Sequence, residues 1–227
     1  MKNLFLFLTF LFFSCSNSNE EMNINLSIDG FKKGNVYLQK IQDSALVNID
    51  SVFVQNGNII KLKHKISSPE IFYINLDISN SEKRIEFFGE KGDIFIKTNL
   101  KKFNSEFEIT GSFNDSVYRN YLKIIKQFNY NRLDLIKQSI NKSQKKELDS
   151  VILIEQKIEN LNKRQYLYSL NFAVTNSNSH VSPLIALNEF SKNKVLLDTI
   201  IKSLNKEILI SKYGKRLKTT LKKIDDL

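Results

Sequence analysis

Apolar and polar residues alternate in short runs between residues 23 and 110, a pattern typical of strands that bury one face. In the first run, Ile24, Leu26 and Ile28 fall on the same side of a strand over residues 23–29. Further strands are predicted at 36–41, 46–54, 59–66, 71–78, 85–88, 93–98 and 107–109. About eight short strands at regular spacing predict an antiparallel β-sandwich or barrel.

Asn56-Gly57 separates two of these runs. A type I′ turn needs positive φ at both of its central residues, which Asn and Gly tolerate best. The sequence therefore predicts a hairpin that pairs residues 46–54 with residues 59–66.

The period changes after Gly111-Ser112, where apolar residues begin to recur every three or four positions. Ser112 or Asn114 is predicted to cap the first helix, because a short side-chain oxygen can accept from a free backbone N–H. Ser182-Pro183 is predicted to open a later helix, with Ser182 as its cap. The other helical stretches are 117–128, 144–174, 195–204 and 214–224. The predicted fold class is therefore α+β, with a β-sandwich over 23–111 and an all-helical segment over 112–227.

The N-terminus carries a targeting pattern. Lys2 precedes an apolar run over residues 4–13 that is too short to cross a bilayer, and Ser14-Cys15 follows it. The stretch resembles a bacterial lipoprotein signal, although Phe12 stands where many such signals have Leu. The resemblance implies a signal peptide over 1–14 that is cleaved before Cys15. Cys15 would then be acylated and hold the chain on a lipid bilayer. The alternative is an ordinary secretory peptide.

Residues 15–22 are predicted to be a polar tether between the lipid and the first strand. Glu20-Glu21 resembles the acidic signal of some surface lipoproteins of Bacteroidetes, but a tether that is merely soluble explains the pair equally well. The predicted location is the cell envelope, on the outer membrane facing the periplasm or the cell surface. The inner membrane is the alternative.

The formal net charge of +10 raises the question of nucleic-acid binding. No basic block is interleaved with aromatic residues, and the densest run, Lys212 to Lys223, fits the polar face of an amphipathic helix. We therefore expect a solvated basic surface and no nucleic-acid partner.

No catalytic or metal-binding pattern emerges from the residues that could form one. The two histidines, His64 and His180, lie far apart in the chain, and Cys15 is the single cysteine. A metal site needs three or four converging ligands, and a serine nucleophile needs a positioned base. The acidic pairs Glu106/Glu108 and Asp225/Asp226 are read as solvated charges. We expect no enzyme activity, no cofactor and no metal.

Several short segments together resemble a known module. They are Ile28-Asp29-Gly30, Val36-Tyr37-Leu38, Asp50-Ser51-Val52, Pro69-Glu70-Ile71-Phe72-Tyr73-Ile74, Glu90-Lys91-Gly92-Asp93-Ile94 and Ile109-Thr110-Gly111-Ser112-Phe113-Asn114. Over about residues 23–121 the chain is similar to DUF4369, a Bacteroidetes module usually found in lipoproteins ahead of a thioredoxin-like AhpC/TSA-type domain. It departs at Ile59-Ile60-Lys61-Leu62, where members commonly have Phe-x-Phe.

Ser211-Lys212-Tyr213-Gly214-Lys215 is similar to the segment that precedes the thioredoxin-like domain in that family. The chain ends at Leu227, so we expect that redox domain to be absent. The leading hypothesis is a non-catalytic binding or scaffolding module with a partner in the envelope. The alternatives are an accessory subunit that recruits a separate thioredoxin-like oxidoreductase, and a hydrolase that depends on His64 or His180.

Five segments resemble the Bacteroidetes O-glycosylation pattern of Asp, then Ser or Thr, then a small apolar residue. They are Asp43-Ser44-Ala45, Asp50-Ser51-Val52, Asp115-Ser116-Val117, Asp149-Ser150-Val151 and Asp198-Thr199-Ile200. We expect one or two to be used at most, with Ser44 favoured because a loop position is accessible.

Overall fold

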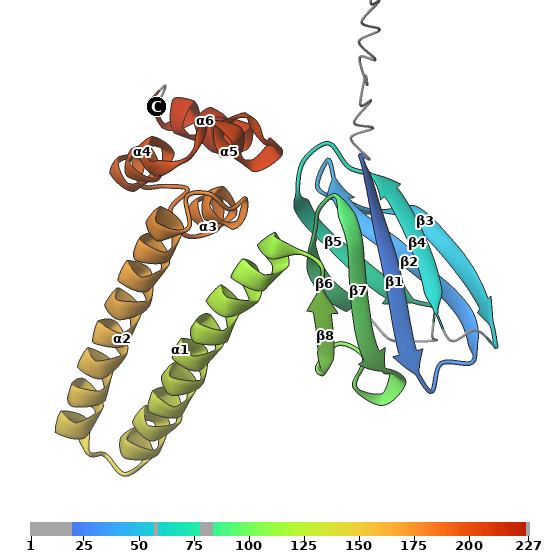
Figure 1. The fold of residues 1–227 in the computed structure, drawn as a ribbon. Helices are drawn as coiled ribbons and strands as arrows, with labels where there is room; N and C mark the ends of the chain where they lie inside the picture. The colour runs from blue at the N-terminus through green and yellow to red at the C-terminus, as the bar shows by residue number, and fades with distance from the viewer. Residues whose placement is uncertain (1–19, 57–58, 78–83, 226–227) are drawn as a thin grey trace, which may run out of the picture.

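The structure is a computed structural model that describes residues 20–56, 59–77 and 84–225. A β-sandwich packs beside a helical part, and two long helices project from the body as a hairpin (Figure 1). The signal peptide, Cys15 and most of the predicted tether lie outside the described residues. The α+β architecture predicted from the sequence is confirmed.

Two four-stranded sheets form the sandwich. In the order in which they pair, the first contains β4 (Ile60–Lys65), β1 (Glu21–Asp29), β7 (Gly92–Asn99) and β8 (Phe107–Thr110). The second contains β3 (Ala45–Gln55), β2 (Lys33–Gln42), β5 (Glu70–Leu76) and β6 (Arg84–Gly89). One pair, β1 with β7, is parallel, whereas the others are antiparallel as predicted.

Alternation of apolar residues builds the core between the sheets, as the sequence predicts. Ile24, Leu26 and Ile28 all point into it. Met22 is fully buried there as well, and β1 begins at Glu21, so the last two residues assigned to the predicted tether belong to the sandwich.

The predicted hairpin across Asn56-Gly57 is wrong. β3 pairs with β2 and β4 pairs with β1, so the two strands lie in different sheets. Val54 on β3 and Leu62 on β4 both point into the core between the two sheets. The chain therefore passes from one sheet to the other between these strands. Asn56 does have the expected positive φ, 58°. Gly57, the other central residue of the predicted turn, lies outside the described residues.

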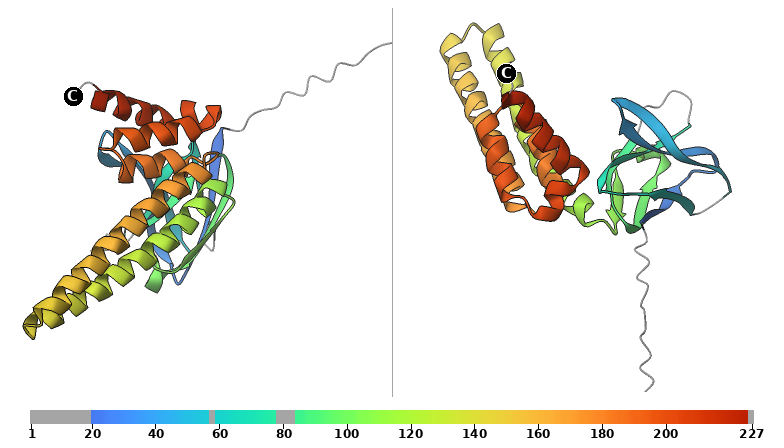
Figure 2. Two further views of the ribbon diagram at one scale, coloured as in Figure 1. Left: turned by 90° about the vertical axis from the view of Figure 1, so that its left-hand side faces the viewer. Right: turned by 90° about the horizontal axis from the view of Figure 1, so that it is seen from above.

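The helical part begins directly after Gly111-Ser112. Its elements are α1 (Phe113–Gln144), α2 (Leu148–Thr175), α3 (Val181–Glu189), α4 (Lys194–Ser203), α5 (Lys206–Ile210) and α6 (Lys212–Asp225). A short 3₁₀ turn, η1 (Leu100–Lys102), belongs to the sandwich and lies between β7 and β8. Helices α3–α6 gather over the ends of α1 and α2 that lie beside the sandwich (Figures 1 and 2). Among the described residues, no helix is long and apolar enough to cross a membrane.

Two helix starts can be compared with the prediction. Ser112 caps α1, because its hydroxyl accepts from the Asp115 N–H at 2.9 Å. Ser182 does not cap α3, which begins at Val181; its hydroxyl instead donates to the Ala173 carbonyl at 2.6 Å and ties α3 to α2. Pro183 still lies in the first turn, where its missing N–H costs no helical bond.

Candidate functional site

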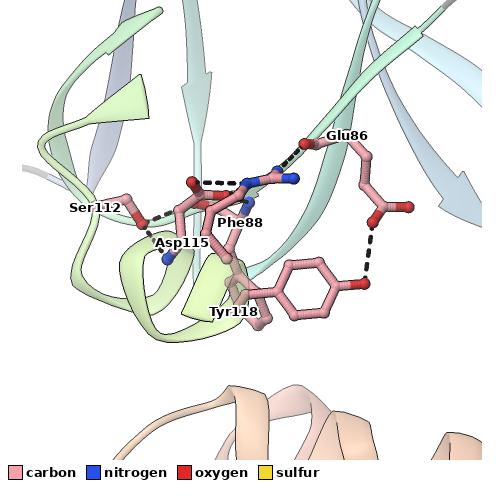
Figure 3. Close-up of polar contacts among 6 residues, drawn as sticks. Glu86, Phe88, Ser112, Asp115 and Tyr118 are labelled. Atoms are coloured by element: carbon pink, nitrogen blue, oxygen red, sulfur yellow. Dashed lines mark hydrogen bonds and ion pairs between the residues drawn. The ribbon is translucent and has the colours of Figure 1, made fainter. Parts of the chain in front are cut away.

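The free edge of β6 is covered by side chains from the start of α1 rather than by another strand (Figure 3). Asp115 accepts from the Phe88 N–H at 2.9 Å, and the Ser112 hydroxyl donates to the Phe88 carbonyl at 2.8 Å. Arg119 donates to the Glu86 carbonyl. Buried backbone groups that lack a partner are costly, so these three side chains replace the missing strand.

The same side chains also bind one another. Arg119 donates to the Asp115 carboxylate through Nε and Nη2, each at 3.2 Å, one helical turn further along α1. The guanidinium carbon lies 5.0 Å from the centre of the Phe107 ring. Asp115 is 1% exposed, so its charge is stable there only because two N–H donors of Arg119 and one of Phe88 face it.

The Phe88 side chain belongs to the helical core, although its backbone belongs to the sandwich. Its ring packs edge-on against Tyr118 and Tyr213, with centroids 6.0 Å apart in both cases. Ile71 on the neighbouring strand also packs against the helical core. Sandwich and helices therefore share apolar contacts as well as hydrogen bonds.

The start of α6 makes a second junction with the sheet. Tyr213 accepts from the Ile71 N–H at 3.1 Å through its phenolic oxygen, and Lys212 forms an ion pair with Glu70. A side chain at Gly214 could not be accommodated, because its Cβ would lie 2.1 Å from the Ile208 carbonyl oxygen. The Ser211–Lys215 segment, singled out in the sequence, thus docks the helices onto β5.

Asn114 makes a third junction, at the turn that joins α2 to α3. Its side-chain oxygen accepts from the Ser179 hydroxyl at 2.9 Å and from the His180 N–H at 2.8 Å. Its side-chain nitrogen donates to Glu90, which also accepts from the Phe113 N–H. Asn114 was predicted as a possible helix cap, but it holds the turn in place instead.

The first two of these junctions border a cleft of about 770 Å³ between the second sheet and the helices. The sheet contributes Lys40 to Ser44, Glu70, Ile71, Tyr73 and Glu86, and the helices contribute Tyr118, Leu184, Asn188, Lys212, Tyr213 and Arg216. The volume lies within the range of small-molecule sites, about 300–1,000 Å³. Asp43 and Ser44, at the rim, form a tight turn with φ of 49° and 69°.

Charged groups in the cleft are mostly paired. Glu70 is nearly buried and lies between Lys212 and Lys40, whose Nζ is 3.6 Å away. Glu86 accepts from the Tyr118 phenol at 3.0 Å. Neither Arg216 nor Asp43 has a side-chain hydrogen bond or ion pair with any residue that the structure describes, so Arg216 is the basic group of the cleft most available to a ligand.

Burial, followed by the nearby Glu86 carboxylate, raises the pKa of Tyr73 to about 12 and raises that of Tyr118 further. Burial likewise raises the pKa of Tyr213 to about 12. All three phenols are therefore protonated at neutral pH and can act as hydrogen-bond donors.

The structure does not bring the two histidines together. His64 lies on β4, where its Nε2 is 3.3 Å from the Lys40 ammonium. His180 is buried at the start of α3. Burial lowers the pKa of both, helped at His64 by Lys40. Among the described residues, no three His, Cys, Asp or Glu side chains form a group that could hold a metal ion.

The remaining predicted positions are dispersed. Glu106 pairs with Lys102, and Glu108 is exposed on β8. The side chains of Asp225 and Asp226 lie outside the described part of the chain. Of the hydroxyls in the glycosylation-like segments, those of Ser44, Ser51, Ser116 and Thr199 are on exposed residues, whereas Ser150 is half-buried. Ser44 lies in the turn between β2 and β3, as expected of the favoured site.

The comparisons with known proteins support the resemblance. The family model of DUF4369, described as a domain of unknown function, matches residues 22–118. Residues 22–118 form a DUF4369 domain. This domain spans the sandwich from Met22 onwards and includes Ser112 and Asp115, two of the three residues whose side chains cover the edge of β6. The third, Arg119, follows directly after it. Searches of curated proteins and of solved structures found no match.

The residues that join the DUF4369 domain to the helices could not be identified from the sequence. Asp115 and Arg119 are four residues apart on a helix, which is typical of a surface ion pair. Their partners on β6 are distant in sequence, and no local pattern indicates such a contact.

We expect Asp115→Asn to destabilise the protein by about 1–3 kcal/mol, because the new amide group would present N–H donors to Arg119 in place of an acceptor. Urea unfolding followed by circular dichroism measures the change. Asp134→Asn, on an exposed part of the same helix, is the control and should unfold near the wild-type midpoint. Equal midpoints for all three proteins would contradict the role given to Asp115.

Stability should fall as the pH drops below about 6.5, the ordinary histidine pKa. The lowered pKa values of buried His180 and half-buried His64 keep both neutral in the folded protein, whereas the unfolded chain binds protons there. Urea midpoints measured between neutral pH and about pH 5.5 test this. His180→Gln should flatten the dependence, since it removes one of the two groups. An unchanged slope in that variant would show that His180 takes up protons in the folded state as readily as in the unfolded chain.

Proposed function

We propose that the protein is a membrane-anchored binding module of the cell envelope that holds a ligand without chemically changing it. The observation that carries the proposal is the cleft between the second sheet and the helices. Its walls come from two parts of the chain that three separate junctions hold together. A preformed cleft loses little conformational entropy when it binds.

The chemistry of the cleft favours binding over catalysis. Its tyrosines are neutral donors, since burial raises their pKa rather than lowering it. Two of its carboxylates, Glu70 and Glu86, already face Lys212, Lys40 and the Tyr118 phenol. A general base or a nucleophile instead needs a group whose pKa is tuned towards neutrality.

The membrane anchor is the acylated Cys15 inferred from the signal-like N-terminus. β1 begins at the end of the sandwich opposite to the direction in which the α1–α2 hairpin points (Figure 1). An anchor before β1 would therefore leave the hairpin directed away from the bilayer. The location that we propose is the outer membrane.

Recruitment of a separate thioredoxin-like oxidoreductase is a weaker candidate. It was suggested by the Ser211–Lys215 segment, whose Tyr213 and Gly214 have structural roles within this chain. The segment therefore gives no independent support to recruitment.

The anchor is tested by expressing the full chain with a radiolabelled or clickable palmitate. We expect label on the wild type and none on Cys15→Ser, because the thiol that would carry the lipid is missing. Ser14→Thr, which leaves Cys15 in place, is a control for expression. Label that persists in Cys15→Ser would contradict lipidation at this residue.

The cleft is tested by thermal unfolding in the presence of defined carboxylates, sugar phosphates, oligosaccharides and short peptides. A ligand at one hundred times its Kd should stabilise the wild type by about 2.7 kcal/mol, or on the order of 5–10 °C in Tm. Arg216→Ala should remove most of that shift without lowering the basal Tm, because the exposed Arg216 side chain makes no hydrogen bond or ion pair within the described chain.

Arg164→Ala is the matched control, since Arg164 is exposed on α2, outside the cleft. It should keep the full shift. A shift that Arg216→Ala and Arg164→Ala both retain would place binding outside the cleft, and turnover of any compound would contradict a non-catalytic role.

A further inference from the structure

The half of the α1–α2 hairpin nearest its turn is a two-helix layer that no other described element covers (Figures 1 and 2). Each helix packs one stripe against the other, with Phe128 and Leu135 half-buried on α1 and Ile154 and Leu161 buried on α2. Stable helical architectures normally bury the remaining apolar faces against a further layer.

Large apolar side chains remain uncovered beside these stripes. On α1, Leu133, Ile136 and Ile140 are 49%, 40% and 55% exposed. They follow i, i+3, i+7 spacing and therefore lie on one face of the helix. On α2, Leu148 and Ile152 are 68% and 53% exposed at i, i+4 spacing.

Both sets lie on the same side of the hairpin. Ile136 follows the stripe residue Leu135 by one position, and Ile152 likewise follows the half-buried Val151. One position turns a side chain by about 100° around the helix axis. Two antiparallel helices are related by a two-fold axis perpendicular to their common plane. Side chains that are rotated by the same angle from the helix–helix contact therefore point to the same face of the hairpin.

The two helices carry opposite charge next to the turn that joins them. Residues 132–144 of α1 contain three basic side chains and one acidic side chain, whereas residues 148–160 of α2 contain three acidic side chains and one basic side chain. Lys137 and Glu155 lie at matching distances from the 145–147 turn. A surface that is basic on one half and acidic on the other is complementary to a copy of itself.

We propose that this face binds a second copy of the chain, so that two hairpins form a four-helix bundle. The two-fold axis runs along the hairpins and places α1 of each copy on α2 of its partner. An axis across the hairpins would instead place α1 on α1, with like charges opposed. The chosen axis also brings both β1 strands to the same side, where two anchors could enter one membrane.

The size of the face is adequate for a specific dimer. About twenty residues of each helix, at about 1.5 Å per residue and about 10 Å per helix width, give a face on the order of 600 Å². Standard interfaces bury about 800 Å² per partner. The exposed Leu and Ile side chains supply the apolar centre that such interfaces need.

Sedimentation equilibrium of residues 16–227, which include every described residue, tests the proposal. We expect a reversible dimer in the micromolar range, and at least about a tenfold weaker one after Ile136→Glu with Ile140→Glu. Ile210→Glu is the matched control, because Ile210 is 67% exposed on α5 and lies outside the face. A wild type that stays monomeric up to millimolar concentration, or a dimer that the double variant leaves unchanged, would overturn the proposal.

A charge-reversal pair decides the arrangement and avoids any folding defect of the double variant. Lys137→Glu and Glu155→Lys should each weaken their own homodimer by placing like charges opposite each other. An equal mixture should form a heterodimer as tight as the wild type, since every opposed pair in it is again complementary. If the mixture shows no preference for the heterodimer, the proposed contact of α1 with the partner's α2 is wrong.

Discussion

An edge strand must satisfy the backbone groups on its free side, and in this protein a helix satisfies them for β6. Ser112, Asp115 and Arg119 reach the groups that a neighbouring strand would otherwise bind, Phe88 N–H, Phe88 C=O and Glu86 C=O. Three side chains within two turns of α1 thus act as the last strand of the sheet. The position of every later helix depends on this contact, because α1 is where the chain leaves the sandwich.

The contact also joins two hydrophobic cores. Phe88 contributes its backbone to the sandwich and its ring to the helical cluster, where Tyr118 and Tyr213 pack on it. Loosening β6 would therefore disturb both cores together. The cleft lies directly beside this contact and is lined by residues of both the second sheet and the helices. Its shape therefore depends on how rigidly the contact holds these two parts together. The α1–α2 hairpin, by contrast, extends away from the junction and is free to serve a separate purpose.

Local patterns in the sequence predicted what depends on neighbouring residues. The alternation of Ile24, Leu26 and Ile28, the change of period at Gly111-Ser112 and the cap at Ser112 are all local, and all are confirmed. The hairpin across Asn56-Gly57 failed because turn chemistry does not specify which sheet the next strand joins. Ser182 was wrong as a cap because a tertiary acceptor, the Ala173 carbonyl, competes for its hydroxyl.

The candidate site could not be predicted from the sequence, because it too depends on contacts between distant segments. Asp115 with Phe88, Tyr213 with Ile71, and Lys212 with Glu70 are pairs of residues distant in sequence, and no local pattern indicates that the two members of a pair meet. The sequence did single out the segment that contains Tyr213 and Gly214. Their function, however, follows only from the close approach of α6 to α5 and to β5.

Native-state hydrogen exchange at the Phe88 amide tests the central claim most directly. If Asp115 covers the edge of β6 and unites the two cores, this amide should exchange only through global unfolding, at the free energy obtained from urea denaturation. Exchange at the rate of a fraying edge strand, well below that free energy, would show that the helices dock weakly and that the cleft between them and the sheet is not a fixed feature of the protein.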